Sequence, residues 1–317
     1  MRYKLPDQPF QRLATLIIVC FALVGIGAGY WSVVRAESLY EEVDFQRQFE
    51  EETSIDRGRI LAADGSILAE TRFDAEGRGE RVYPYPPLVH ITGSRTLRYF
   101  QIGLEESHDD YLRGAQGQQG LDAFDEILHE QVVGADVVTT IRPALQQAAD
   151  NLLGNRAGAV IVMDPRDGAI LAMASHPIYD PNTYDENAEA IEVDPSQPRL
   201  NRATRGLYTP GSVFKVVTMA GALAQGKTSL TERFQNENGI FVVESFPIRD
   251  GSDLPVRNAP YDLGHALAFS SNVTFAQLGL RLGPDGMRQI ARDFGFGEEP
   301  FFDDLPTEAS RIGSDEF

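Results

Sequence analysis

Residues 208–225 read YTPGSVFKVVTMAGALAQ. After Pro210 this segment is almost entirely apolar or small, which predicts a helix from Gly211 to Gln225 that lies inside a core. Lys215 is the exception in this helix. Because a buried, unpaired ammonium costs several kcal/mol, we expect Lys215 to be partnered, to be neutral, or to lie at the mouth of a cavity.

Ser212 precedes Lys215 by three positions, and residues i and i+3 share one face of a helix. The amine can then reach the hydroxyl and take its proton, which predicts Ser212 as a nucleophile and Lys215 as its base. Free backbone N–H groups in the first helical turn would favour a developing oxyanion at the same place. The competing interpretation is that Ser212 only caps the helix and that Lys215 extends its amine into solvent.

A second polar group precedes a later helix. Residues 266–279 read ALAFSSNVTFAQLG, and Ser270 and Asn272 come just before a helix that we expect from Val273 to Leu282. Capping is their simplest role, since Ser and Asn are preferred cap residues. A hydroxyl and an amide on a tight turn could also relay a proton and hold a substrate amide.

Ser212-Val213-Phe214-Lys215 and Ser270-Ser271-Asn272 resemble the S-x-x-K and S-x-N motifs of the penicillin-binding serine acyltransferases. The resemblance continues in the flanking phrases NRATRGLYTPGSVFKV and FSSNVTFAQLGLRLG. RGRILAADGSILAE and GAVIVMDPRDGAILAMASHPIYDPN look like the monofunctional class B branch, in particular its short actinobacterial, PbpA-like type. The resemblance covers nearly the whole chain from Arg57 onward.

This resemblance implies an α+β fold, in which a small α/β pedestal precedes a transpeptidase domain built from an antiparallel sheet and helices. It implies a peptidoglycan D,D-transpeptidase that needs no cofactor. Ser212 would be acylated by the D-Ala-D-Ala end of a stem peptide, with Lys215 taking its proton. Ser270 would pass a proton to the leaving amine, and Asn272 would bind the substrate's amide. The resemblance also implies covalent β-lactam binding at Ser212, and as partners a SEDS-type glycosyltransferase and divisome or elongasome proteins.

The family's third motif, K-T/S-G, is not found. Gly226-Lys227-Thr228-Ser229 is no substitute, because Lys227 lies only 12 residues after Lys215 and the last residue is not Gly. We therefore expect the transpeptidase domain to be incomplete at its carboxyl end and the chain as it stands to be inactive. The alternatives are a non-catalytic cell-wall scaffold or β-lactam-sensing homologue, and a secreted β-lactamase.

Leu13 to Val34 contains 22 residues without a charge. At about 1.5 Å per residue such a helix spans the ~30 Å hydrocarbon layer, which predicts a single transmembrane helix. Arg2, Lys4 and Arg12 on its amino-terminal side predict a cell-membrane protein with its carboxy-terminal domains outside the cytoplasm. A cleaved signal peptide is the alternative, although its apolar region normally has only about 7–15 residues.

The predicted domains are a cytoplasmic tail (1–12), the transmembrane helix (13–34), the pedestal (35–140) and the incomplete transpeptidase domain (141–317). Turn signals at 64–65 and 165–168 predict two β-hairpins, in 57–70 and 157–175. Apolar periodicity predicts helices in 121–134, 143–154 and 284–296. The segment 81–93, rich in Pro and aromatics, is not expected to be helical.

The 28 Lys and Arg residues against 47 Asp and Glu give the chain a net charge of −19. Such a surface repels phosphate backbones, which argues against nucleic acid as a partner. The single cysteine, Cys20, cannot form an internal disulfide, and the five histidines are scattered without a zinc-binding pattern. We therefore expect no metal site.

Overall fold

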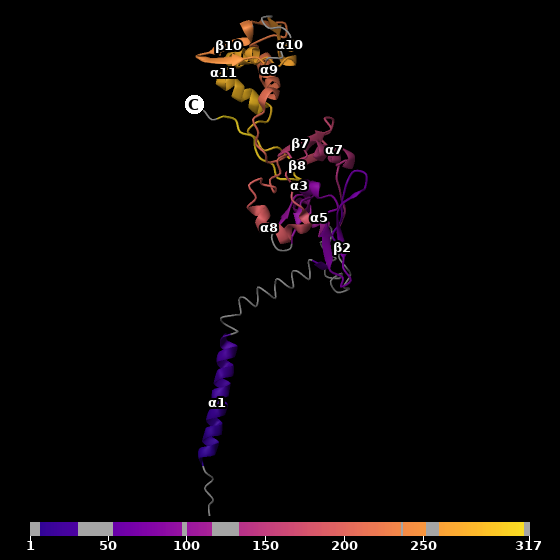
Figure 1. Ribbon diagram of the computed structural model, residues 1–317, viewed down its shortest axis with the longest axis vertical. Helices are drawn as coiled ribbons and strands as arrows, with labels where there is room; N and C mark the ends of the chain where they lie inside the picture. The colour runs from indigo at the N-terminus through magenta and orange to yellow at the C-terminus, as the bar shows by residue number, and fades with distance from the viewer. Residues whose placement is uncertain are drawn as a thin grey trace, which may run out of the picture. The chain divides into compact units, whose positions relative to one another are not determined.

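The computed structural model, drawn in Figure 1, describes residues 7–30, 53–96, 100–115, 133–235, 237–251 and 260–313. By the contacts between its residues the chain divides into two compact units. The first comprises 1–85, 94–101 and 108–139, and the second comprises 86–93, 102–107 and 140–317. Residues 121–132 of the predicted helix in 121–134 and residues 31–34 of the predicted membrane segment lie outside the described residues, and Val133 and Gly134 are not helical.

The chain begins its described part with helix α1 (Asp7–Gly29). Its large apolar side chains, among them Ile18, Phe21 and Ile26, are mostly exposed. Within the described ranges, no helix has both the length and the apolar character needed to cross a bilayer.

The first unit contains a four-stranded sheet in the order β3-β2-β1-β6. Its strands are β1 (Ile60–Leu61), β2 (Ile67–Phe73), β3 (Gly79–Val82) and β6 (Val137–Val138). β1 pairs antiparallel with β2 and parallel with β6, so the predicted hairpin in 57–70 is confirmed. Gly65 has a φ of 82°, which explains why glycine occupies the turn. The unit also contains β4 (Ser94–Arg95) and helix α5 (Asp109–Leu112).

The expectation that 81–93 contains no helix is wrong. A 3₁₀ turn, η2 (Pro86–Leu88), leads directly into the single helical turn α3 (Val89–Thr92). The two prolines stand at the start of the helical segment, where a missing N–H leaves no intrahelical bond unmade, so they initiate the turn instead of preventing it. The short elements β5 (Gln101–Ile102) and α4 (Leu104–Ser107) follow.

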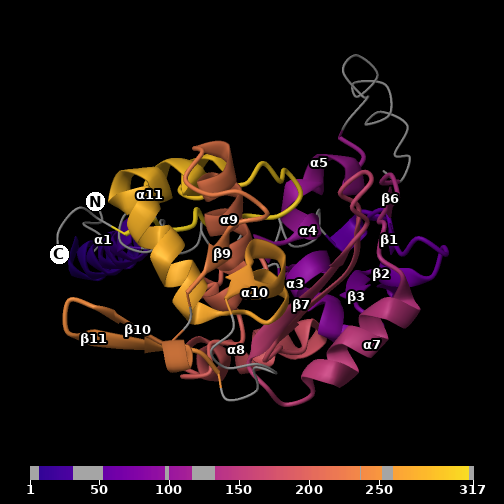
Figure 2. The ribbon, with the colours of Figure 1, turned by 90° about the horizontal axis from the view of Figure 1, so that it is seen from above.

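In the second unit, helix α7 (Pro143–Leu153) packs on the antiparallel hairpin of β7 (Gly158–Met163) and β8 (Ile170–His176) (Figure 2). Both elements are as predicted, with Pro143 in the first turn and Gly154 ending the helix at a φ of 52°. The buried Gln146 amide joins helix to strand, because it accepts a hydrogen bond from Met173 N at 2.8 Å and donates one to Met173 O at 3.1 Å. The turn η3 (Pro181–Thr183) and helix α8 (Tyr184–Glu192) come next.

The rest of the second unit surrounds a core of buried apolar residues, among them Ala222, Phe234, Leu263 and Leu278. Its helical elements are η4 (Gly211–Phe214), α9 (Lys215–Ala224), η5 (Glu237–Gly239), α10 (Leu263–Ala268) and α11 (Asn272–Asp293). Its strands are β9 (Arg233–Phe234), β10 (Ile240–Val243), β11 (Phe246–Arg249) and β12 (Tyr261–Asp262), paired as β9–β12 and β10–β11.

α9 and α11 lie side by side (Figure 2). A Cβ at Gly221 would approach the side chain of Ile290 to 2.8 Å, so glycine is required at this point of contact. α11 contains a break at Gly283, which has a φ of 67°, and this break separates the two predicted helices of 273–282 and 284–296. The packing of α11 on α9 positions the amino-terminal ends of both helices in the site described next.

Candidate active site

Lys215, the first residue of α9, is half-buried and forms three hydrogen bonds to the turn before α11 and to the first residue of α11. Its Nζ donates to Ser270 O at 2.7 Å, to Ser270 Oγ at 2.9 Å and to Asn272 Oδ1 at 2.7 Å. Nζ also lies 5.7 Å from the centre of the Phe275 ring, within the range of a cation–π contact. The structure therefore brings together three of the four predicted site residues.

Ser270 lies in the left-handed region of backbone conformation, with a φ of 55°. It follows α10, where Ser270 N donates to Leu267 O at 3.0 Å and Ser271 N donates to Ala266 O at 2.8 Å. This pair of bonds is the Schellman arrangement that ends many helices, and the left-handed position in it is usually occupied by glycine. A serine there accepts backbone strain, which is common at functional sites.

Ser271 and Asn272 connect this turn to α11. Ser271 caps the helix by accepting a hydrogen bond from Thr274 N, and its hydroxyl donates to the carboxylate of Asp250 at 3.1 Å. Asp250 also accepts from Val273 N at 2.9 Å, and Asn272 Nδ2 donates to Arg249 O at 2.8 Å. The amide of Asn272 is thus oriented, with its nitrogen toward the end of β11 and its oxygen toward Lys215.

Ser212 lies in η4, one turn before Lys215, and its side chain is exposed. Phe214 of the same turn packs edge-to-face on Phe296, with ring centres 5.3 Å apart, which anchors η4. Lys215 N donates to Ser212 O at the end of η4, but in the described part of the chain no side-chain hydrogen bond joins Ser212 to Lys215, contrary to the expectation from their spacing. The reason is visible in the three acceptors from Ser270 and Asn272, which together occupy the Lys215 ammonium.

The electrostatic surroundings of Lys215 act in opposite directions. Partial burial lowers the pKa of its ammonium, and the carboxylate of Asp250 opposes this shift. Asp250 was not singled out from the sequence, because nothing in Ile248-Arg249-Asp250-Gly251 links it to a helix that starts more than 20 residues later. Across the described residues, no group of His, Cys, Asp and Glu side chains is arranged to hold a metal ion.

An exposed serine one helical turn before a lysine of lowered pKa, which contacts a second hydroxyl and an amide, is an arrangement typical of serine acyltransferases with the S-x-x-K motif. The comparisons with known proteins agree. Residues 57–137 match the family model of the penicillin-binding protein A dimerisation domain, and residues 158–314 match that of the penicillin-binding protein transpeptidase domain. The chain belongs to the penicillin-binding protein family.

Among its curated relatives is the peptidoglycan D,D-transpeptidase PbpA of Mycolicibacterium smegmatis, which is 33% identical over 306 residues. That alignment covers 92% of this chain and 62% of the relative. PbpA of Mycobacterium tuberculosis is 31% identical, with 96% of this chain and 65% of the relative covered. The chain thus spans less than two thirds of the length of these relatives.

Solved structures show the same likeness. The imipenem acyl-enzyme complex of penicillin-binding protein A from M. tuberculosis matches with a TM-score of 0.74 at 31% identity. The match covers 84% of this chain and 65% of that chain. The D,D-transpeptidase domain of a peptidoglycan glycosyltransferase from Eggerthella lenta matches with a TM-score of 0.69 at 33% identity, covering 82% of this chain and 58% of that chain.

Proposed function

We propose that the protein is a peptidoglycan D,D-transpeptidase and that this chain carries its nucleophile. Ser212 Oγ attacks the carbonyl carbon of the penultimate D-alanine of a stem peptide and gives its proton to Lys215. The C–N bond to the terminal D-alanine breaks, and the leaving amine receives a proton through Ser270. The amine of a second stem peptide then attacks the Ser212 ester, which forms the cross-link and frees the hydroxyl.

The observation that carries this proposal is the contact of Lys215 Nζ with Ser270 Oγ at 2.9 Å and with Asn272 Oδ1 at 2.7 Å. A base must lie within hydrogen-bond reach of the groups with which it exchanges protons, and catalytic contacts often tighten only when substrate binds. The exposure of Ser212 agrees with a nucleophile that must meet a polymer. Asn272, held by Arg249 O, would receive the substrate's amide.

The acyl-enzyme structures with imipenem and penicillin G are those of the M. tuberculosis relative. By this likeness we propose that β-lactams acylate Ser212, which provides the test. Fluorescent penicillin is added to the purified full-length gene product in detergent, and the labelled peptide is identified by mass spectrometry. We expect label on Ser212, and its loss in S212A and K215A.

S229A is the matched control, because Ser229 is an exposed serine in the same unit. Label that survives in S212A would refute the assignment of the nucleophile. A folded parent protein that takes no label would refute the enzymatic proposal and favour the non-catalytic scaffold or β-lactam-sensing homologue.

We also propose the predicted membrane placement and domain division, with a cytoplasmic tail in 1–12, an anchor in 13–34, a pedestal in 35–140 and the transpeptidase part in 141–317. The support is the 22-residue charge-free run in the sequence and the exposure of apolar side chains such as Ile18, Phe21 and Ile26. Fractionation of cells producing the protein tests the anchor, because an anchored protein stays in the membrane pellet in high salt. Recovery in the soluble fraction would refute it.

The proposed partners are a SEDS-type glycosyltransferase and divisome or elongasome proteins, which the class B resemblance implies. The apolar side chains of the proposed anchor are one surface through which the protein could contact these partners within the membrane. Site-specific photocrosslinking from positions 18 and 21 tests this, since side chains at these positions of α1 are exposed. Crosslinks to lipid alone would refute it.

A further inference from the structure

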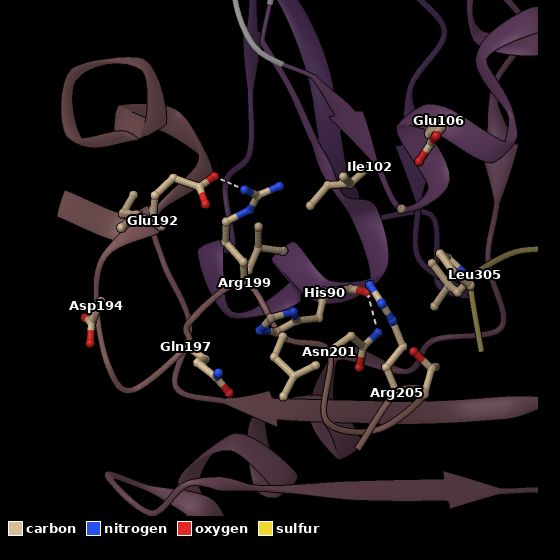
Figure 3. Close-up of a pocket in the computed structure, with 16 residues that line it drawn as sticks. His90, Ile102, Glu106, Glu192, Asp194, Gln197, Arg199, Asn201, Arg205 and Leu305 are labelled. Atoms are coloured by element: carbon tan, nitrogen blue, oxygen red, sulfur yellow. Dashed lines mark hydrogen bonds and ion pairs between the residues drawn. The ribbon is translucent and has the colours of Figure 1, made fainter. Parts of the chain in front are cut away.

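A pocket of about 380 Å³ lies within the second unit, away from the four residues of the candidate active site (Figure 3). One wall is the loop that follows α8, including Arg199, Asn201 and Arg205. The other walls come from α3, from the region of α4, and from Leu305 and Pro306. Its volume is at the small end of those that hold small ligands in proteins.

Two exposed residues of opposite charge, Arg205 and Glu106, line the pocket without a protein partner for their side chains among the described residues. Arg199 forms an ion pair with Glu192 and is therefore neutralised. The side chains of Arg205 and Glu106, by contrast, form no hydrogen bond or ion pair with any described residue. Arg205 reaches into the pocket from the loop, and Glu106 directs its carboxylate toward the same space from α4 (Figure 3). The pocket thus offers one cation and one anion on different elements.

The pocket also offers a buried hydrogen-bond acceptor. His90 is only 5% exposed, and its Nε2 lies 3.3 Å from Pro177 O. Because a carbonyl oxygen only accepts, Nε2 carries the proton and Nδ1 of the neutral ring is an acceptor, with no partner among the described residues. Burial lowers the pKa of His90 to about 4, so the ring is neutral at neutral pH.

Two further features suit a polar ligand with small apolar parts. The Thr204 hydroxyl beside Arg205 is buried and has no hydrogen-bond partner in the described structure, which is uncommon for a buried polar atom. Between the charged groups the lining is apolar, with Ile102, Leu200 and Leu305. A ligand with a charge at each end and a small apolar middle matches this distribution.

We propose that this pocket binds a short zwitterionic peptide of two or three small residues. Its carboxylate pairs with Arg205, its ammonium pairs with Glu106, and one of its N–H groups donates to His90 Nδ1. The apolar lining receives the side chains. The proposal does not depend on acylation of Ser212, so failure of the proposed function would leave it standing.

The test is isothermal titration of the detergent-solubilised 317-residue chain with trialanine as the probe. Three matched peptides have one or both charges removed: N-acetyl-trialanine, trialanine amide, and the peptide capped at both ends. Because a charge-assisted hydrogen bond is roughly twice as strong as a neutral one, each cap is expected to lower affinity about tenfold. Equal binding of the doubly capped peptide, or no binding of trialanine at about 10 mM, would overturn the proposal.

Variants assign each charge to its residue. R205M should weaken trialanine about tenfold, yet leave trialanine amide unaffected, since that peptide has no carboxylate to lose. E106Q should show the reverse pattern, with no further effect on N-acetyl-trialanine. R166M, which removes an exposed arginine from the β7–β8 turn, is the control. An R166M effect as large as that of R205M would refute the assignment, and the capped peptides remain decisive on the parent chain if a variant misfolds.

Discussion

Replacing Ser270 by glycine separates the cost of its backbone conformation from the value of its hydroxyl. Ser270 has a φ of 55°, and its hydroxyl accepts from Lys215 Nζ at 2.9 Å. Both S270G and S270A remove this hydrogen bond, but only glycine adopts the left-handed conformation without a steric penalty. The difference in stability between S270G and S270A therefore measures the free-energy cost of the left-handed backbone conformation at this position.

The left-handed conformation costs an L-residue roughly 1–2 kcal/mol. The larger conformational entropy of glycine in the unfolded chain returns about 0.5–1 kcal/mol of this. S270G is therefore expected to be roughly 0.5–1 kcal/mol more stable than S270A, a difference of about 1–4 °C in Tm for a domain of this size. Acylation by fluorescent penicillin should fall in both variants alike, by about 10²–10⁴ if Ser270 takes part in proton transfer.

The assay is thermal unfolding followed by circular dichroism, with penicillin labelling of the full-length protein in parallel. The control is Glu244, which has a φ of 57° between β10 and β11. E244G should likewise exceed E244A in stability, while both label at the parent rate. Equal Tm values for S270G and S270A would refute the strain, and parent-like labelling of S270G would refute the role of the hydroxyl.

Three more predictions concern stability and pH. Because the pKa of His90 falls from 6.5 to about 4 on folding, the unfolded chain binds a proton that the folded chain does not, and stability decreases as pH falls from 6.5 toward 4. H90Q should remove about 2 kcal/mol of the loss between pH 7.5 and pH 5, measured by urea unfolding. G93A should cost more than about 3 kcal/mol in the same assay, because its Cβ would lie 1.6 Å from Ile102 O at a φ of 79°. D250N should lower the pKa of Lys215 further, so the rise of penicillin acylation with pH should occur at lower pH.

Each of these has a matched comparison. For the His90 prediction the control is H265Q, which removes an exposed histidine. If the stability of H90Q changed with pH in parallel with that of the parent protein, the prediction for His90 would be contradicted. G65A has the same positive φ with open space around the added carbon, so a cost equal to that of G93A would show that the clash with Ile102 is relieved. An unchanged pH profile in D250N would show that Asp250 does not influence Lys215.

Local signals in the sequence predicted much of the fold. The hairpin turns at 64–65 and 165–168 contain Asp-Gly pairs, and Pro143 and Gly154 mark the limits of α7 within one or two residues. These succeed because a turn or cap depends on residues adjacent in the chain. The prolines of 81–93 argue against the one-turn helix at 89–92, because proline breaks the interior of a helix, but at the start of a helical segment it favours the helix.

The candidate site was predicted in its members but not in its contacts. Lys215 bonds to residues 55 and 57 positions away, and the turn that presents them contains a left-handed serine where the sequence offers no glycine as a signal. The sequence does not predict the pocket at His90 either, because its walls come from segments near positions 90, 106 and 205, which are far apart in the chain. Such arrangements depend on tertiary packing, which residue patterns along the chain do not record.

The three contacts of Lys215 constrain how it can act as a base. Ser270 O and Asn272 Oδ1 can only accept, so the amine must donate to both. A neutral amine has two N–H groups for them and one lone pair. The hydroxyl of Ser270 is the one contact that can reverse direction, because it can donate to that lone pair.

The neutral amine therefore fits the observed geometry only with its lone pair facing Ser270, and the lone pair must turn from Ser270 to Ser212 before Lys215 can take the nucleophile's proton. A proton accepted from Ser212 then lies on an amine that already contacts Ser270 Oγ, the group proposed to deliver it to the leaving amine. Burial lowers the pKa of Lys215 and so favours the neutral amine, which is the form that can accept a proton. The three acceptors favour the ammonium cation that forms once the proton has been accepted. One of the contacts that withhold Lys215 from Ser212 in this structure, that with Ser270 Oγ, is thus the one through which the proton would leave afterwards.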